Sequence, residues 1–218
     1  MELELHLLGP FRATLAGRPL GGFQSAKTKA LLLYLVTEAA MADAPHPSPR
    51  EKLMTMLWPE TLQRSAQANL RQSLYQLRRL IPAVTAREGG TPVPLLFADR
   101  QVVQINRRAD YALDVADFLQ LVNAQATPEQ LMQAVRLYRD ALFADFYLAD
   151  SEPFETWAAA RRATLLRLAL SALERLTHHF LEASDFEAAE QFARRQLALD
   201  GLRDSAHRQL MVALAYGG

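Results

Sequence analysis

The stretch from Arg64 to Ile81 combines side-chain types at a spacing that suits hydrogen bonding to a polyanion. Its apolar residues recur at helical spacing, and the opposite face carries polar side chains. The stretch holds four arginines and no acid, whereas a solvated helix face normally mixes both signs. Arg, Asn and Gln can bond base edges at two points, and Arg and Tyr also reach phosphates. The predicted reading residues are Asn69, Arg71, Gln72, Tyr75, Gln76, Arg78 and Arg79. The alternative is a surface helix that happens to lack acids.

The charge of the chain is distributed unevenly although its formal net charge is zero. Up to Arg108 there are 14 basic and 8 acidic residues, a net charge of +6. The remaining residues carry 10 basic and 16 acidic side chains, a net charge of −6. Such asymmetry indicates nucleic-acid contact by the basic part, although a basic surface can also serve solubility alone.

The elements around this helix follow a recognisable order. Strict alternation predicts a strand over residues 2–8, and a second strand follows the Gly9-Pro10 turn. Ser25 is a predicted N-cap for a helix that reaches Ala39. Further predicted elements are a loop over 43–49, a helix from Pro49 to Trp58, the reading helix from 64 or 65 to 81, and a hairpin formed by 95–97 and 102–105. Strands, three helices and a hairpin make a winged helix-turn-helix.

Two further basic sites have open interpretations. Arg100, at the tip of the predicted hairpin, could enter a minor groove, whose negative potential attracts guanidinium groups. A plain two-stranded element with an exposed arginine fits the sequence equally well. Lys27 and Lys29 lie near the start of the first helix, where they could contact phosphates or could be ordinary solvated lysines.

Beyond Asp110 the chain is predicted to be all helical. Leu173, Leu176 and Phe180 recur 34 residues later as His207, Leu210 and Leu214. A period of 34 with helix-turn-helix content is typical of tetratricopeptide-type stacking. The last helix would leave an uncovered apolar face, which indicates a longer protein or a homodimer. The predicted helices cover 115–123, 128–143, 154–183 (long enough to contain a break or a kink), 186–199 and 203–216.

Several function classes are disfavoured. Half of the residues are hydrophobic, and there is no cysteine. The longest apolar run, from Ala30 to Val36, is far shorter than the ~18–20 residues that span a bilayer. No phosphate loop, nucleophile elbow or zinc-type His motif occurs, so we expect no enzyme, cofactor or metal. Asp110, Asp114 and Asp117 are interpreted as a solvated helix start. The default location is the cytoplasm.

Three segments carry a resemblance to a known family. LELHLLGPFRATLAGRPL, KTKALLLYL and LWPETLQRSAQANLRQSLYQLRRLI resemble the OmpR/PhoB-type winged helix of the Streptomyces antibiotic regulatory protein (SARP) family. In that family a tryptophan-containing loop precedes a helix ending in LRR-L, as Trp58 and Leu77–Leu80 do here. The segment from DVADFLQLV to FARRQLALDG resembles the bacterial transcriptional activator domain. The predicted class is α+β, with a winged-helix domain at 1–108 and an all-α, TPR-like activator domain at 109–218 that is incomplete at its C-terminus.

The resemblance implies a sequence-specific regulator, an activator of transcription, in the bacterial cytoplasm at the nucleoid. It places the helix at 65–81 in the major groove and Arg100 in the minor groove. It also implies a transactivation loop that contacts RNA polymerase or the DNA backbone, with Trp58, Glu60, Gln63 and Arg64 as its residues. The expected partners are double-stranded promoter DNA with tandem half-sites, RNA polymerase and a second copy of the chain. The alternative function is a TPR-like protein-interaction module whose winged domain does not bind DNA.

Overall fold

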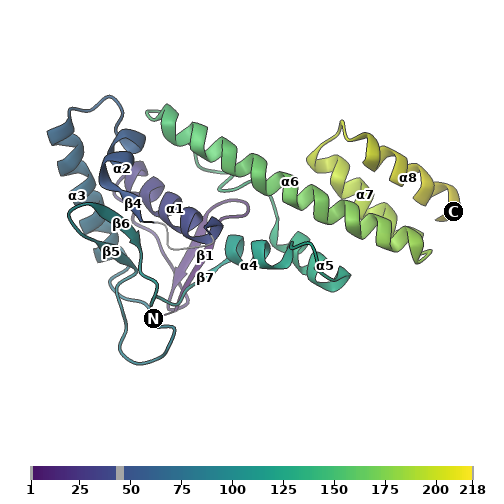
Figure 1. The fold of residues 1–218 in the computed structure, drawn as a ribbon, viewed down its shortest axis with the longest axis horizontal. Coiled ribbons are helices and arrows are strands. Elements are labelled where there is room, and N and C mark those ends of the chain that lie inside the picture. The colour runs from purple at the N-terminus through teal and green to yellow at the C-terminus, as the bar shows by residue number, and fades with distance from the viewer. Residues whose placement is uncertain (1, 43–46, 218) are drawn as a thin grey trace. The chain divides into compact units, whose positions relative to one another are not determined.

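Residues 2–42 and 47–217 are described by a computed structural model, in which contacts divide the chain into two units (Figure 1). The first unit comprises Met1–Ala116 and Leu142–Ala160, and the second comprises Asp117–Ala141 and Arg161–Gly218. Residues 142–160 therefore pack with the N-terminal part of the chain, although they lie well beyond the predicted domain boundary at residue 108.

The first unit is built on a four-stranded sheet in the order β3-β2-β1-β7. The strands are β1 (Leu3–His6), β2 (Arg12–Leu15), β3 (Arg18–Pro19) and β7 (Ala112–Leu113). The predicted alternation is confirmed, because Leu3 and Leu5 are buried whereas Glu4 and His6 are half-buried. Neighbours β1 and β2 are antiparallel, but β1 and β7 run parallel across a gap of about one hundred residues in the chain.

Residues far along the chain complete the sheet just after β1. The carboxylate of Asp114 accepts hydrogen bonds from the backbone N–H groups of Leu7 (2.8 Å) and Leu8 (3.0 Å). Leu8 also forms a β-bridge with Leu142, and the N–H of Phe143 donates to the carbonyl of Leu7 (2.6 Å). The interpretation of Asp114 as a solvated residue is wrong, because this carboxylate is 4% exposed and satisfies two backbone donors.

Three helices and a hairpin follow the sheet in the predicted order. The helices are α1 (Ala26–Met41), α2 (Arg50–Leu57) and α3 (Gln63–Leu80). Ser25 caps α1 as predicted, because its hydroxyl accepts from the N–H of Thr28. The hairpin consists of β5 (Leu96–Ala98) and β6 (Val102–Ile105), and β4 (Ser48–Pro49) pairs with β6. The predicted loop over 43–49 is therefore wrong at Ser48–Pro49, and its residues 43–46 lie outside the described residues.

The rest of the chain is helical, with two corrections. Its helices are α4 (Asp114–Leu121), α5 (Pro128–Leu137), α6 (Glu152–Glu182), α7 (Phe186–Leu199) and α8 (Asp204–Gly217). The predicted helix over 128–143 ends at Leu137, because Leu142 and Phe143 pair with Leu8 and Leu7 just after β1, and Phe143 takes a left-handed backbone conformation (φ 36°). The long helix α6 runs through 31 residues as a single α-helix, without a break.

Within the second unit, helices pack as a TPR-like stack. Leu131 and Val135 of α5 pack with Leu173 and Leu176 of α6 in one apolar cluster. Helix α8 lies beside α7 and buries two alanines, Ala206 and Ala213 (Figure 1). The other face of α8 is apolar and exposed, as predicted: Met211 is 62%, Leu214 48% and Tyr216 73% exposed.

Candidate nucleic-acid interface

Helix α3 presents one apolar and one polar face. Five residues pack inward, which holds the helix against α1 and α2: Ala66, Leu70, Ser73, Leu74 and Leu77. Six of the seven predicted reading residues are exposed on the opposite face: Asn69, Arg71, Gln72, Tyr75, Arg78 and Arg79. The polar face is therefore available to a ligand, and the apolar stripe beneath it fixes its direction.

Tyr75 and Arg79 act as a pair on this face. The guanidinium of Arg79 lies 5.9 Å from the ring centroid of Tyr75, within the range of a cation–π contact. Tyr75 is 56% exposed in spite of its size. The ring and the guanidinium group, one helical turn apart on α3, together form a flat surface with a positive charge.

Gln76 departs from the predicted reading face. Its side-chain oxygen accepts a hydrogen bond from the hydroxyl of Thr28 (2.8 Å). Its amide nitrogen donates to the side chain of Gln24 (2.6 Å). Because both ends of the amide are occupied by α1 and the segment before it, we remove Gln76 from the candidate base-reading residues.

A groove of about 680 Å³ runs between α3 and the tip of the β5–β6 hairpin. Two predicted residues line it, Arg71 from α3 and Arg100 from the hairpin. The groove also holds side chains that the sequence analysis did not single out: Pro49, Arg50, Glu51, Met54, Gln67, Asp99 and Gln101. Gln67 could have been found from its position one turn before Arg71 on α3. Arg50 could not, because its position follows from the short β4–β6 pairing.

The tip of the hairpin is a tightly hydrogen-bonded turn. The carboxylate of Asp99 accepts from the N–H groups of Gln101 (2.7 Å) and Val102 (2.8 Å). These bonds, that of Val102 above all, hold the pKa of Asp99 below its usual value. Arg50 adds a hydrogen bond from Nε to the carbonyl of Asp99 (2.9 Å). The neighbouring Arg100 therefore extends from a defined turn.

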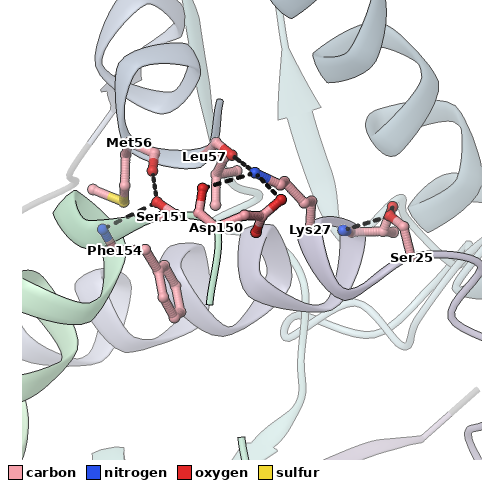
Figure 2. Close-up of polar contacts among 8 residues, drawn as sticks. Ser25, Lys27, Met56, Leu57, Asp150, Ser151 and Phe154 are labelled. Atoms are coloured by element: carbon pink, nitrogen blue, oxygen red, sulfur yellow. Dashed lines mark hydrogen bonds and ion pairs between the residues drawn. The ribbon is translucent and has the colours of Figure 1, made fainter. Parts of the chain in front are cut away.

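Lys27 does not share this face. Its ammonium donates to the carbonyl of Leu57 and forms an ion pair with Asp150 (Nζ–Oδ2 3.0 Å), as Figure 2 shows. The side chain is 15% exposed, and its Nζ also lies 6.0 Å from the ring of Trp58. Because these partners occupy the charge, we leave Lys27 out of the candidate interface.

The predicted transactivation loop divides into buried and exposed parts. Trp58 closes α2 and is 8% exposed, so its ring packs inward rather than toward a partner. Glu60 is exposed and lies in the loop. Gln63 and Arg64 are also exposed, but they belong to the first turn of α3. Leu62, which precedes α3 and is 82% exposed, is not among the residues predicted for this loop. Between α2 and α3 the exposed residues are therefore Glu60 and Leu62, with Pro59 and Thr61 half-buried.

Neither a metal site nor a membrane span occurs among the described residues. In residues 2–42 and 47–217, no three His, Asp or Glu side chains lie together in a group that could hold a metal ion. Over the same residues, every helix is too short or too polar to cross a bilayer.

Comparisons with known proteins support a regulator of transcription. Residues 113–218 match the family model described as the bacterial transcriptional activator domain. The fold is similar to that of Mycobacterium tuberculosis EmbR, whose structure was solved in complex with a low affinity phosphopeptide. The TM-score is 0.72 at 21% identity, and the match covers 99% of this chain but 55% of the EmbR chain. No curated protein matches the sequence. The predicted fold class is confirmed, and the predicted resemblance to the bacterial transcriptional activator domain is confirmed over residues 113–218.

Proposed function

We propose that this chain, which carries a bacterial transcriptional activator domain, binds promoter DNA in a sequence-specific manner and activates transcription from it. One observation supports this proposal most strongly. The acid-free polar face of α3 and the tip of the β5–β6 hairpin border the same open groove. A recognition helix in the major groove and a wing in the adjacent minor groove need this arrangement.

The proposed mechanism has two steps. The net charge of +6 on residues 1–108 attracts the phosphate backbone, which brings the protein to DNA of any sequence. Side chains on α3 then distinguish the bases, and each good bidentate contact is worth ~1–3 kcal/mol of discrimination. Asn69, Arg71 and Gln72 have the donors and acceptors for this step. Arg78, Arg79 and Arg100 are better suited to phosphates and the minor groove.

Selection from a random pool of duplex DNA tests this proposal directly. We expect the wild-type chain to enrich one motif in tandem half-sites about one helical turn apart. Arg71→Ala or Gln72→Ala should relax the preference at one position of that motif, with about a 5- to 100-fold loss of affinity. Arg208→Ala removes an equally exposed arginine on α8 and serves as the matched control.

A protein-interaction module is the competing function. It predicts no motif and no binding to duplex DNA at low salt, even at micromolar protein. Absence of an enriched motif, or absence of binding to duplex DNA, would rule out a DNA-reading role for α3. The function would then rest on protein contacts of the activator domain.

Contact with RNA polymerase belongs to the same proposal. The exposed residues of the α2–α3 loop, Glu60 and Leu62, combine a charge with an apolar side chain next to the proposed DNA surface. We expect Leu62→Ser to lower transcription from a saturated promoter while the affinity for that promoter stays unchanged. A parallel loss of promoter affinity would assign Leu62 to DNA binding instead.

A further inference from the structure

The C-terminal end of α2 needs outside partners. The last carbonyl groups of a helix find no N–H donor within the same helix, and this end of the helix carries a partial negative charge. The last turn of α2, Met54–Leu57, contains no basic residue that could answer this charge. The N–H of Trp58 occupies the carbonyl of Met54, and the carbonyls after it, those of Met56 and Leu57 among them, need donors from outside the helix.

Two side chains from distant parts of the sequence supply these donors. The hydroxyl of Ser151 donates to the carbonyl of Met56, and the ammonium of Lys27 donates to that of Leu57 (Figure 2). The carboxylate of Asp150 neutralises Lys27 at 3.0 Å. Ser151 is 1% exposed, so its hydroxyl is withheld from water. We call Lys27, Asp150 and Ser151 the carbonyl clamp.

The clamp is itself held in place by the start of α6. The hydroxyl of Ser151 accepts from the N–H of Phe154 (3.3 Å), and its own N–H donates to the carbonyl of Leu148 (3.1 Å). The N–H of Leu148 in turn donates to the carboxylate of Glu155 (2.7 Å). These bonds make residues 148–155 a closed turn. The turn lies in the sequence that matches the activator domain, but it packs in the first unit.

The clamp acts at the point where the α2–α3 loop begins. Trp58 follows Leu57 directly, and its ring lies beside Lys27. The N–H of Thr61 donates to the carbonyl of Trp58 (3.1 Å), so the position of Trp58 constrains that of Thr61. Helix α3 starts two residues after Thr61, at Gln63.

We infer that Lys27 and Ser151 are positioning residues that let the activator-domain segment 148–155 set the α2–α3 loop. This inference rests on the proposed function, in which that loop and the helix after it contact polymerase and DNA. Lys27 is thus a basic residue near the interface that acts through backbone carbonyls rather than on phosphates.

Hydrogen exchange of the full chain, measured without DNA, tests the clamp. Loss of one hydrogen bond of this kind corresponds to about a fivefold change in a local equilibrium. We therefore expect peptides spanning residues 56–62 to exchange at least about fivefold faster in Lys27→Met and Ser151→Ala. Ser151→Thr keeps a hydroxyl and should restore wild-type protection. Lys27→Met leaves the bond from Ser151 to α6 intact, so it separates the clamp from the helix start.

Lys29→Met is the matched control. Lys29 lies on the same helix, but its Nζ faces the rings of Phe11 (4.7 Å) and Phe146 (4.9 Å) and not the end of α2. This variant should leave exchange over residues 56–62 unchanged.

Two results would overturn the inference. One is unchanged loop exchange in both Lys27→Met and Ser151→Ala. The other is an equal rise in exchange over every peptide of the first unit, which would make the clamp a source of general stability. A failure of the wild-type chain to bind DNA would count against the proposed function alone, because this exchange measurement contains no DNA.

Discussion

The hydroxyl of Thr28 lies 2.8 Å from the side-chain oxygen of Gln76 and donates a hydrogen bond to it. This contact separates two neighbouring turns of α3 that look alike in the sequence. Gln76 holds α3 to α1, whereas Gln72, one turn earlier, is exposed. The same residue type therefore serves cohesion at one position and is free for recognition at the other.

Alanine at position 76 should lower stability, whereas alanine at position 72 should weaken DNA binding. Gln76→Ala removes the hydrogen bonds that Gln76 forms with Thr28 and Gln24 and should lower the free energy of unfolding by about 1–2 kcal/mol. Gln72→Ala should leave stability within about 0.5 kcal/mol of wild type and weaken binding to the selected motif. Urea denaturation and gel shift of both variants check this. A loss of motif preference in Gln76→Ala at unchanged stability would return Gln76 to the reading face.

Binding to DNA should depend steeply on salt. If the basic part neutralises about six phosphates, the slope of log K against log salt concentration is about −5. Removing one exposed arginine that contacts phosphate, as in Arg78→Ala, should reduce the magnitude of the slope by about 1. Fluorescence anisotropy over a salt series measures both values. A slope near zero would show that the charge of residues 1–108 has no part in binding.

Acid should loosen the tip of the hairpin. The pKa of Asp99 is lowered in the folded protein because its carboxylate accepts two backbone hydrogen bonds. The stabilising effect is therefore complete above about pH 4, the unfolded-state value, and is lost as the pH falls through the lower folded pKa. We expect the amide resonances of Gln101 and Val102 to titrate together below pH 4. In Asp99→Asn this titration should be absent, and its persistence would assign it to another carboxylate.

The buried carboxylate of Asp114 should be more important for folding than its neighbours. Asp114→Asn replaces an acceptor oxygen by an amide group that faces a backbone N–H, at a cost of about 1–3 kcal/mol. Asp117→Asn, three residues along α4 at an exposed position, should cost less than about 0.5 kcal/mol. Denaturation in urea compares the two, and equal values would contradict the role assigned to Asp114.

Alkaline titration should show a raised pKa for Tyr138. Burial, and to a lesser degree the charge of Asp140, raises the pKa of this phenol to about 12. The folded state therefore keeps its proton longer than the unfolded chain, whose tyrosines ionise near pH 10. Stability from Tyr138 is complete below about pH 10 and declines as the pH rises toward 12. The ultraviolet difference titration between wild type and Tyr138→Phe measures this, and a midpoint near pH 10 would contradict the burial.

Local patterns in the sequence predicted the elements that depend on nearby residues. The alternation of Leu3 and Leu5 with polar residues follows from one covered face of a strand. Ser25 predicts the start of α1, because a hydroxyl just before a helix can accept from an N–H of its first turn, here that of Thr28. The exposed arginines of α3 were found in the same way, because the apolar stripe fixes which side chains face outward.

Long-range pairing decided what the sequence could not show. Lys27 and Trp58 have types typical of a DNA contact and of a loop contact, but Asp150 and the core take them inward. The helix predicted over 128–143 fits its periodicity, yet the bridge from Leu142 to Leu8 ends it early. Each of these partners lies far away in the sequence, and the spacing of hydrophobic residues within a segment does not show which distant residue it will contact.

The position of Leu142 beside Leu8 has a consequence for synthesis of the protein. A ribosome that has completed residues 1–108 has not yet made β7, which pairs with β1, or Leu142, which bridges Leu8 after the end of β1. Until they emerge, the nascent chain exposes unpaired strand groups, which favour aggregation. Translation must therefore enter the activator domain before the first unit can finish folding, so that a chain truncated near its middle lacks residues that complete its sheet.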